Sequence, residues 1–299
     1  IGYVARTDRY GTTKLVGSAN EILLYALKRS TENPEILPDR IYDEYISTRY
    51  GKKALEPVKN AFKKAYDIVL SSMYILGTNA AKHSSMDYDP YSSSYDRHVS
   101  GRWLEPPVVF VEHGINKEFH YWKDIINHIA PARFKTKDSR LGLEARYVIE
   151  QNWVTPVELM DSLYLSYIIT EKRYGVSLAN EALADIERAK DLLTPSDYDD
   201  LYRLFKRTAL TAQLYEAVST AYFGFRMYAK GKSYRYENLE EQIRSALNRI
   251  DLVTDEMKGM QGEYPLGQWD WLKDAETALS YKNKILTGWK EYNNVKFTQ

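Results

Sequence analysis

The 299-residue chain carries 41 Lys and Arg residues against 41 Asp and Glu, and 44% of its residues are hydrophobic. This balance is typical of a globular protein with an ample core, and a neutral net charge argues against general nucleic-acid binding. The absence of cysteine excludes disulfides, thiol catalysis and cysteine-based zinc sites. A chain without thiols suits an oxidising compartment, so we expect a periplasmic or secreted protein. No apolar run approaches the roughly 20 residues needed to span a bilayer.

The first predicted element is a short apolar strand, Ile1–Val4, and the residues after it are charged. Arg6, Asp8 and Arg9 lie within five residues of the end of that strand. Two interpretations of these charges stay open. They form either an ordinary turn with internal ion pairs or the polar end of a strand that contacts a ligand.

Three helices are predicted next. The first covers 18–33, because Ser18 suits an N-cap, Glu21 follows three residues later and apolar residues recur at helical spacing. The second covers 38–50, since its first residue is a proline and a glycine follows its end. The third covers 54–76, where apolar residues line one face.

An irregular segment is predicted over 77–116, where turn-forming residues replace the helical period. A long irregular segment inside a compact domain is uncommon and usually functional. All five histidines of the chain lie between 83 and 128. None of their spacings fits a helical metal site, so we predict no metal and no cofactor.

This His-rich and Tyr-rich segment has the mixture of side chains that binds sugars. Aromatic faces stack on sugar rings, while charged groups and hydroxyls bind the ring hydroxyls. The alternative is a solvent-exposed polar insertion without a ligand. The candidate binding residues are Tyr91, His98, Arg102, Trp103, Glu112 and His113.

The rest of the chain is predicted to be helical almost throughout. Thr155-Pro156 and Thr194-Pro195 each supply an N-cap followed by a proline at the first helical position. A turn is predicted over 259–267, where three glycines and a proline interrupt the pattern. The predicted helices cover 117–129, 140–153, 156–173, 177–193, 195–229, 236–258 and 269–291.

The stretch "YVARTDRYGTTKLVGSANEILLYALKRSTENPEILPDRIYDEYISTRYG" resembles the barrel-to-helix junction of family 67 glycoside hydrolases, the α-glucuronidases, and related polysaccharide-degrading enzymes. A later patch, "WDWLKDAETALSYKNKI" (269–285), looks like the late helix of their helical domains. The chain departs from the family at Tyr45, where the family typically has Trp.

The resemblance implies a mainly α chain: the last βα unit of a (β/α)8 barrel over 1–35, then an α-helical C-terminal domain over 36–299 with the insertion at 77–116. It implies the C-terminal portion of a glycoside hydrolase acting on a polysaccharide or acidic oligosaccharide, with the catalytic carboxylates outside this chain. Arg6, Asp8 and Arg9 would then lie at the substrate end of the barrel. The implied partners are the sugar, the preceding barrel of the same protein and a second copy of the chain.

Two interpretations from other classes remain open at this point. The chain could be a free-standing helical module that binds carbohydrate or protein without catalysis. It could also be a helical scaffold without any ligand.

Overall fold

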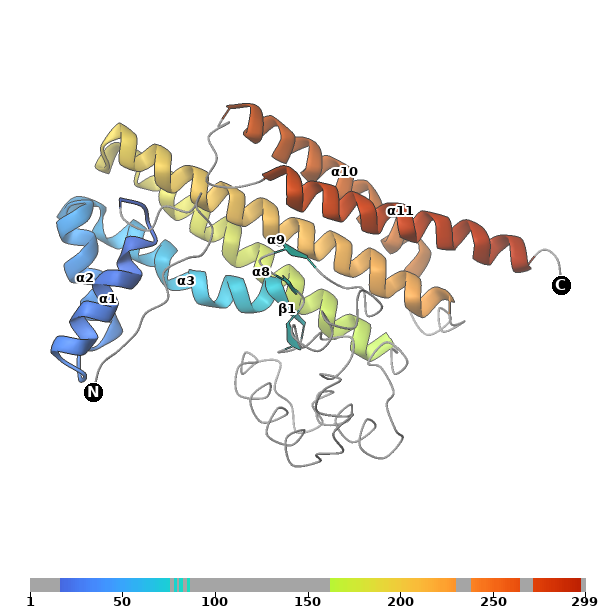
Figure 1. The fold of residues 1–299 in the computed structure, drawn as a ribbon, viewed down its shortest axis with the longest axis horizontal. Helices are drawn as coiled ribbons and strands as arrows, with labels where there is room; N and C mark the ends of the chain where they lie inside the picture. Colours follow the sequence, from blue (N-terminus) through green and yellow to red (C-terminus); the bar gives the residue numbers. More distant parts are fainter. Residues whose placement is uncertain are drawn as a thin grey trace.

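The computed structural model describes residues 17–75, 78–79, 81–82, 85–86, 162–229, 238–263 and 271–296. Within these ranges the chain is mainly α, as predicted, and forms seven α-helices (Figure 1). Their bounds are α1 (Glu21–Glu32), α2 (Pro38–Arg49), α3 (Leu55–Met73), α8 (Ser162–Arg188), α9 (Pro195–Ala229), α10 (Leu239–Glu263) and α11 (Trp271–Lys296).

Short elements join the helices. The 3-10 turns are η1 (Lys52–Ala54) and η4 (Lys190–Leu192). Two antiparallel pairs of two-residue strands follow α3: β1 (Tyr74–Ile75) with β2 (Thr78–Asn79), and β3 (Ala81–Lys82) with β4 (Ser85–Met86). The prediction that α3 reaches residue 76 was therefore wrong by three residues, because the chain turns into β1 after Met73.

Two of the helix starts that proline marks are confirmed, and the third, at Pro156, lies outside the described residues. Helix α2 begins at Pro38 and α9 begins at Pro195. At the start of α9 the hydroxyl of Thr194 accepts a hydrogen bond from the backbone N–H of Asp197 at 3.2 Å and donates to the Asp197 carboxylate at 2.7 Å. These bonds satisfy a donor that the first turn of a helix leaves unpaired.

The first helix begins later than predicted, at Glu21. Ser18 is not its N-cap, because the chain makes a turn through Asn20 before the helix starts. The Ser18 hydroxyl accepts a hydrogen bond from the N–H of Asn20 at 3.3 Å, and the Glu21 carboxylate accepts one from Gly17 at 3.0 Å. The two side chains expected to cap the helix thus hold the turn in front of it.

The prediction of two helices over 156–173 and 177–193 was wrong, because α8 is continuous through Gly175. That glycine lies where α3 packs against α8. A Cβ at Gly175 would be 3.0 Å from the Cβ of Ser71 and 3.0 Å from the Oγ of Ser72. The glycine therefore permits close helix packing and does not end the helix. Helix α10 likewise continues through Gly259, where a turn was predicted.

Helices α8 and α9 form the long central pair of the bundle, with α1, α2 and α3 beside one part and α10 and α11 beside another (Figure 1). Helix α3 runs antiparallel to α8, since Ser71 lies near Lys172 while Lys64 pairs with Asp185 at 2.7 Å. Helix α9 packs against both α8 and α10.

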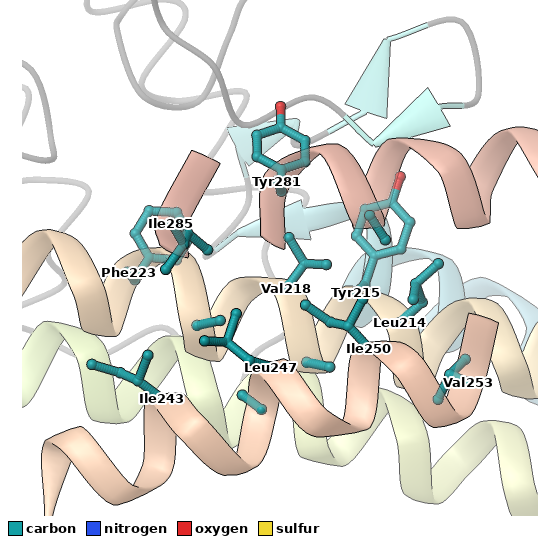
Figure 2. Packing of buried hydrophobic residues seen from close by; sticks show 14 of the residues in the cluster. Leu214, Tyr215, Val218, Phe223, Ile243, Leu247, Ile250, Val253, Tyr281 and Ile285 are labelled. Atoms are coloured by element: carbon teal, nitrogen blue, oxygen red, sulfur yellow. The ribbon is translucent and has the colours of Figure 1, made fainter. Parts of the chain in front are cut away.

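Two clusters of buried apolar residues hold the bundle together. One joins α9, α10 and α11 with the first half of α8, and Figure 2 shows its members Leu214, Val218, Phe223, Ile243, Leu247, Ile250, Tyr281 and Ile285. The other joins α2, α3 and the second half of α8 to the start of α9, and includes Tyr45, Ile46, Val58, Phe62, Ala182, Ile186 and Phe205. Helix α9 belongs to both clusters and therefore links them.

Several predictions fall outside the described residues: the strand Ile1–Val4, most of the segment over 77–116, and the helices over 117–129 and 140–153. No helix in the described part of the chain combines the length and the apolar character needed to cross a membrane.

Candidate functional site

All nine residues predicted from the sequence to bind substrate lie outside the described residues. They are Arg6, Asp8, Arg9, Tyr91, His98, Arg102, Trp103, Glu112 and His113. Their role therefore stays a prediction. Among the residues that the structure describes, a different group of polar side chains forms the best-defined candidate site.

The candidate site is a polar groove of about 460 Å³ over α9, with walls from α8 and α10. The position follows from the packing of α9 against both neighbours (Figure 1). We call it the Glu216 groove and define it by its lining residues, which are Arg173, Val176 and Asn180 of α8, Gln213 and Glu216 of α9, and Arg249, Leu252, Val253 and Glu256 of α10.

Glu216 forms the floor of this groove and keeps only 5% of its side-chain surface exposed. A buried carboxylate requires partners, because burial removes its hydration. The Nη2 atom of Arg249 lies 3.0 Å from Oε1 and 2.9 Å from Oε2 of Glu216. The hydroxyl of Thr220 lies 3.4 Å from Oε1, and the Nε atom of Arg173 lies 3.6 Å from it. Two arginines from different helices therefore share one carboxylate.

Both arginines reach the solvent side of the groove, since the side chain of Arg173 is 60% exposed and that of Arg249 is 41% exposed. Beside them, the side-chain amide of Gln213 donates to the side-chain oxygen Oδ1 of Asn180 at 3.5 Å. On the α10 side, Glu256 pairs with Lys206 at 2.5 Å. The groove thus offers guanidinium and amide groups next to the apolar side chain of Leu252.

A second buried polar cluster lies where α8 meets the end of α3. The side chains of Lys172 and Glu171 are both 0% exposed and pair at 2.8 Å. The Lys172 ammonium also donates to the carbonyl oxygens of Ser71 at 2.5 Å and Ser72 at 3.1 Å. Burial lowers the pKa of Lys172.

A lysine with a lowered pKa can serve in catalysis, but the geometry of Lys172 favours a structural role. An ammonium group has three N–H donors, and the described part of the chain alone places three acceptors around Lys172. Two of those acceptors are carbonyls of the last turn of α3, which lack intrahelical partners. Lys172 therefore caps α3 from a neighbouring helix.

A metal centre finds no support in the described part of the chain, where no three His, Asp or Glu side chains are grouped closely enough to hold an ion. This concerns only those ranges, and all five histidines lie outside them.

The sequence analysis did not predict the Glu216 groove, although one feature of the sequence indicates it. Glu216 is the single charged residue in the stretch 208–225, "TALTAQLYEAVSTAYFGF", which is otherwise apolar, small or uncharged. A lone acid in such a helix predicts a buried carboxylate with partners elsewhere. No local pattern indicates that those partners are Arg173 and Arg249, because they come from other helices.

Fold and groove together define a mainly α-helical bundle with a polar surface groove. Comparisons of the chain with protein-family models, with curated proteins and with solved structures find no match.

Proposed function

We propose that the chain is the helical C-terminal portion of a carbohydrate-active enzyme, a glycoside hydrolase acting on a polysaccharide or acidic oligosaccharide. In this proposal the helices pack beside a catalytic (β/α)8 barrel and complete its substrate cleft, and the catalytic carboxylates lie outside the chain. Support comes from the resemblance of residues 3–51 to such a junction and, above all, from the surface of α1.

Helix α1 contains no buried residue, yet it carries leucines at helical spacing. Leu23 is 64% exposed and Leu27, one turn later, is 38% exposed. In a (β/α)8 barrel each outer helix packs its apolar stripe against the barrel strands. An exposed pair of leucines on α1 is the surface expected of the last barrel helix.

The other side of α1 is already attached to the bundle. Ile22 and Tyr25 pack against the cluster around Tyr45, and the ring centroids of Tyr25 and Tyr45 are 5.5 Å apart. The Nε atom of Arg29 binds the Glu44 carboxylate at 2.9 Å. At 3.6 residues per turn, the attached face and the leucine face lie on roughly opposite sides of the helix. Helix α1 is therefore suited to join two bodies.

The proposal gives roles to the predicted binding residues. Arg6, Asp8 and Arg9 follow the proposed last strand of the barrel and would contact an anionic or hydroxyl-rich sugar, since arginine binds carboxylates through two parallel hydrogen bonds. The segment with Tyr91, His98, Arg102, Trp103, Glu112 and His113 would form part of the same cleft. A helical face of the domain would provide a homodimer contact.

A direct test compares the 299 residues alone with a longer protein that includes the segment encoded immediately upstream. We expect hydrolysis of an acidic polysaccharide or aryl glycoside only by the longer protein. Strong turnover by the 299 residues alone would overturn the proposal.

The role of the leucine face is tested by Leu23→Asp together with Leu27→Asp. We expect unchanged thermal stability in the 299-residue chain and a clear loss of stability and activity in the longer protein, because only there would the charges be buried. Leu286→Asp is the matched control, since this leucine of α11 is 45% exposed. Equal behaviour of the α1 variant and the control in the longer protein would contradict barrel packing.

A second candidate function is a free-standing helical carbohydrate-binding module, and the Glu216 groove is the observation that favours it. Such a module needs no barrel. It predicts oligosaccharide binding by the 299 residues alone, lost on substitution of Tyr91, His98 or Trp103 if the segment around 77–116 is the binding surface. Calorimetry against neutral and acidic oligosaccharides separates this function from the enzyme proposal.

A further inference from the structure

We infer that the Glu216 groove binds a small hydroxylated molecule through an anionic group, held between Arg173 and Arg249. This inference does not depend on the enzyme proposal, because it concerns binding by the helical bundle and involves no catalytic residue. It follows from the unused donors of the two arginines, from the local charge and from the chemistry of the groove walls.

The first argument is the number of unused donors. Arg249 contacts both oxygens of Glu216 through one nitrogen, Nη2, although a guanidinium has five N–H donors. Its Nε atom is buried and has no hydrogen-bond partner in the described part of the chain, so the donors within reach of a ligand are those of the other nitrogen, Nη1. Arg173 lies near Glu216 through its Nε atom, at 3.6 Å from Oε1. Glu216 thus anchors both arginines, while donors of each guanidinium remain for another acceptor.

The second argument is charge. One arginine would balance the buried carboxylate of Glu216, but two converge on it. On the rim, Glu256 and Lys206 form an ion pair at 2.5 Å and cancel each other. The groove therefore carries one positive charge in excess. Arg249, which the buried carboxylate of Glu216 holds at 2.9–3.0 Å, needs little reorganisation to bind an anion.

The third argument concerns the rest of the ligand. The hydrogen bond from Gln213 to Asn180 leaves the amide nitrogen of Asn180 and the amide oxygen of Gln213 for other partners. A donor and an acceptor side by side suit hydroxyl groups, which both donate and accept. Val176 and Leu252 add apolar surface. A volume of about 460 Å³ lies within the roughly 300–1,000 Å³ typical of small-molecule sites.

The anionic group could be a carboxylate or a phosphate, since arginine pairs bind both. Three open-chain probes separate these sources while the hydroxyl groups stay nearly constant: D-gluconate carries a carboxylate, D-glucitol 6-phosphate carries a phosphate, and D-glucitol carries no charge. We expect calorimetry on the 299-residue chain to show binding of at least one anion with a Kd of about 1 mM or tighter. Neutral glucitol is expected not to bind detectably.

The variant that tests the site is Arg173→Gln, because this exposed side chain can be changed while Arg249 still pairs with Glu216. We expect affinity for the bound anion to fall at least about tenfold. The matched control is Arg188→Gln, which removes an arginine of the same helix with 65% exposure. This control lies about 22 Å further along α8 and should change affinity less than about twofold.

Preferential binding of gluconate assigns a carboxylate ligand, and preferential binding of glucitol 6-phosphate assigns a phosphate ligand. Either result supports the site when only Arg173→Gln weakens binding. The inference is overturned if neither anion binds, if glucitol binds as tightly as the anions, or if both variants weaken binding equally, which indicates attraction to general surface charge.

Discussion

The ammonium group of Lys172, midway along α8, donates a hydrogen bond of 2.5 Å to the carbonyl oxygen of Ser71, in the last turn of α3. The same group binds Ser72 and Glu171, and the side chains of the lysine and the glutamate are fully buried. Lys172→Met would leave two helix-end carbonyls and a buried carboxylate short of a partner. We expect a loss of about 3–5 kcal/mol, because breaking one side of a buried pair exposes the other to its full desolvation penalty.

Urea denaturation checks this prediction, with a lower midpoint at an unchanged slope. The double variant Glu171→Gln with Lys172→Met removes both charges and should be less destabilised than Lys172→Met alone. A midpoint of Lys172→Met equal to that of the unsubstituted chain would contradict the capping role.

Gly175→Ala is expected to destabilise the bundle by about 1–3 kcal/mol, because a new methyl group would force α3 and α8 apart. The closest atoms are the Cβ of Ser71 and the Oγ of Ser72, each 3.0 Å from the added carbon. Gly259→Ala in α10 is the matched control, since nothing lies within 4 Å of its added carbon. It should gain about 0.5–1 kcal/mol from helix propensity. Thermal unfolding of both variants measures the contrast, and a stabilising Gly175→Ala would refute the close approach.

Acid is expected to weaken the contact between α1 and α2. Hydrogen bonds from Arg29 and Arg40 lower the pKa of Glu44 from its ordinary 4.5 to about 2. Between pH 4.5 and about 2 the unfolded chain binds more protons than the folded one. The contribution of Glu44 to stability is therefore fully present above pH 4.5 and is lost as the pH falls toward 2. Glu44→Gln should reduce the slope of melting temperature against pH between these values. An unchanged slope would show that Glu44 does not contribute.

Alkali is expected to destabilise the folded chain through Tyr45, which packs between Tyr25 and Tyr50. Burial raises the pKa of Tyr45 from 10.0 to about 12. Between these values the folded chain holds a proton that the unfolded chain has released, so stability falls as the pH rises from 10 to 12. Tyr45→Phe removes the titrating hydroxyl and should flatten this decline. The measurement is the melting temperature of both proteins between pH 10 and 12. A melting temperature of Tyr45→Phe that falls as steeply with pH as that of the unsubstituted chain would contradict the burial of Tyr45.

Local chemistry predicted helix existence well. Pro38 and Pro195 mark true helix starts because the fixed φ of proline and its missing N–H suit only the first turn. One error arose where a tertiary contact overrides local preference. The sequence pattern predicted a break between helices over 174–176, but Gly175 lies inside α8, where α3 packs against it. Such a contact joins residues about 100 positions apart, and no window along the sequence contains both.

The candidate groove was beyond local reasoning for the same reason. Glu216 and Arg249 are 33 residues apart and come from neighbouring helices. The isolated acid in an apolar helix indicates that a partner must exist, but packing decides which partner it is. The residues predicted from composition, such as His98 and Trp103, lie outside the described ranges and await the binding experiments.

The contact between Lys172 and Ser71 joins two residues that are 101 positions apart in the sequence. It therefore closes a long loop of the chain between α3 and α8. The closure entropy of a loop grows slowly with its length, by only about 0.6 kcal/mol for each doubling. Evolution could therefore lengthen, shorten or exchange the chain between α3 and α8 without redesigning the helices. The contact between Lys172 and Ser71 therefore makes the connection between α3 and α8 a place where insertions are tolerated.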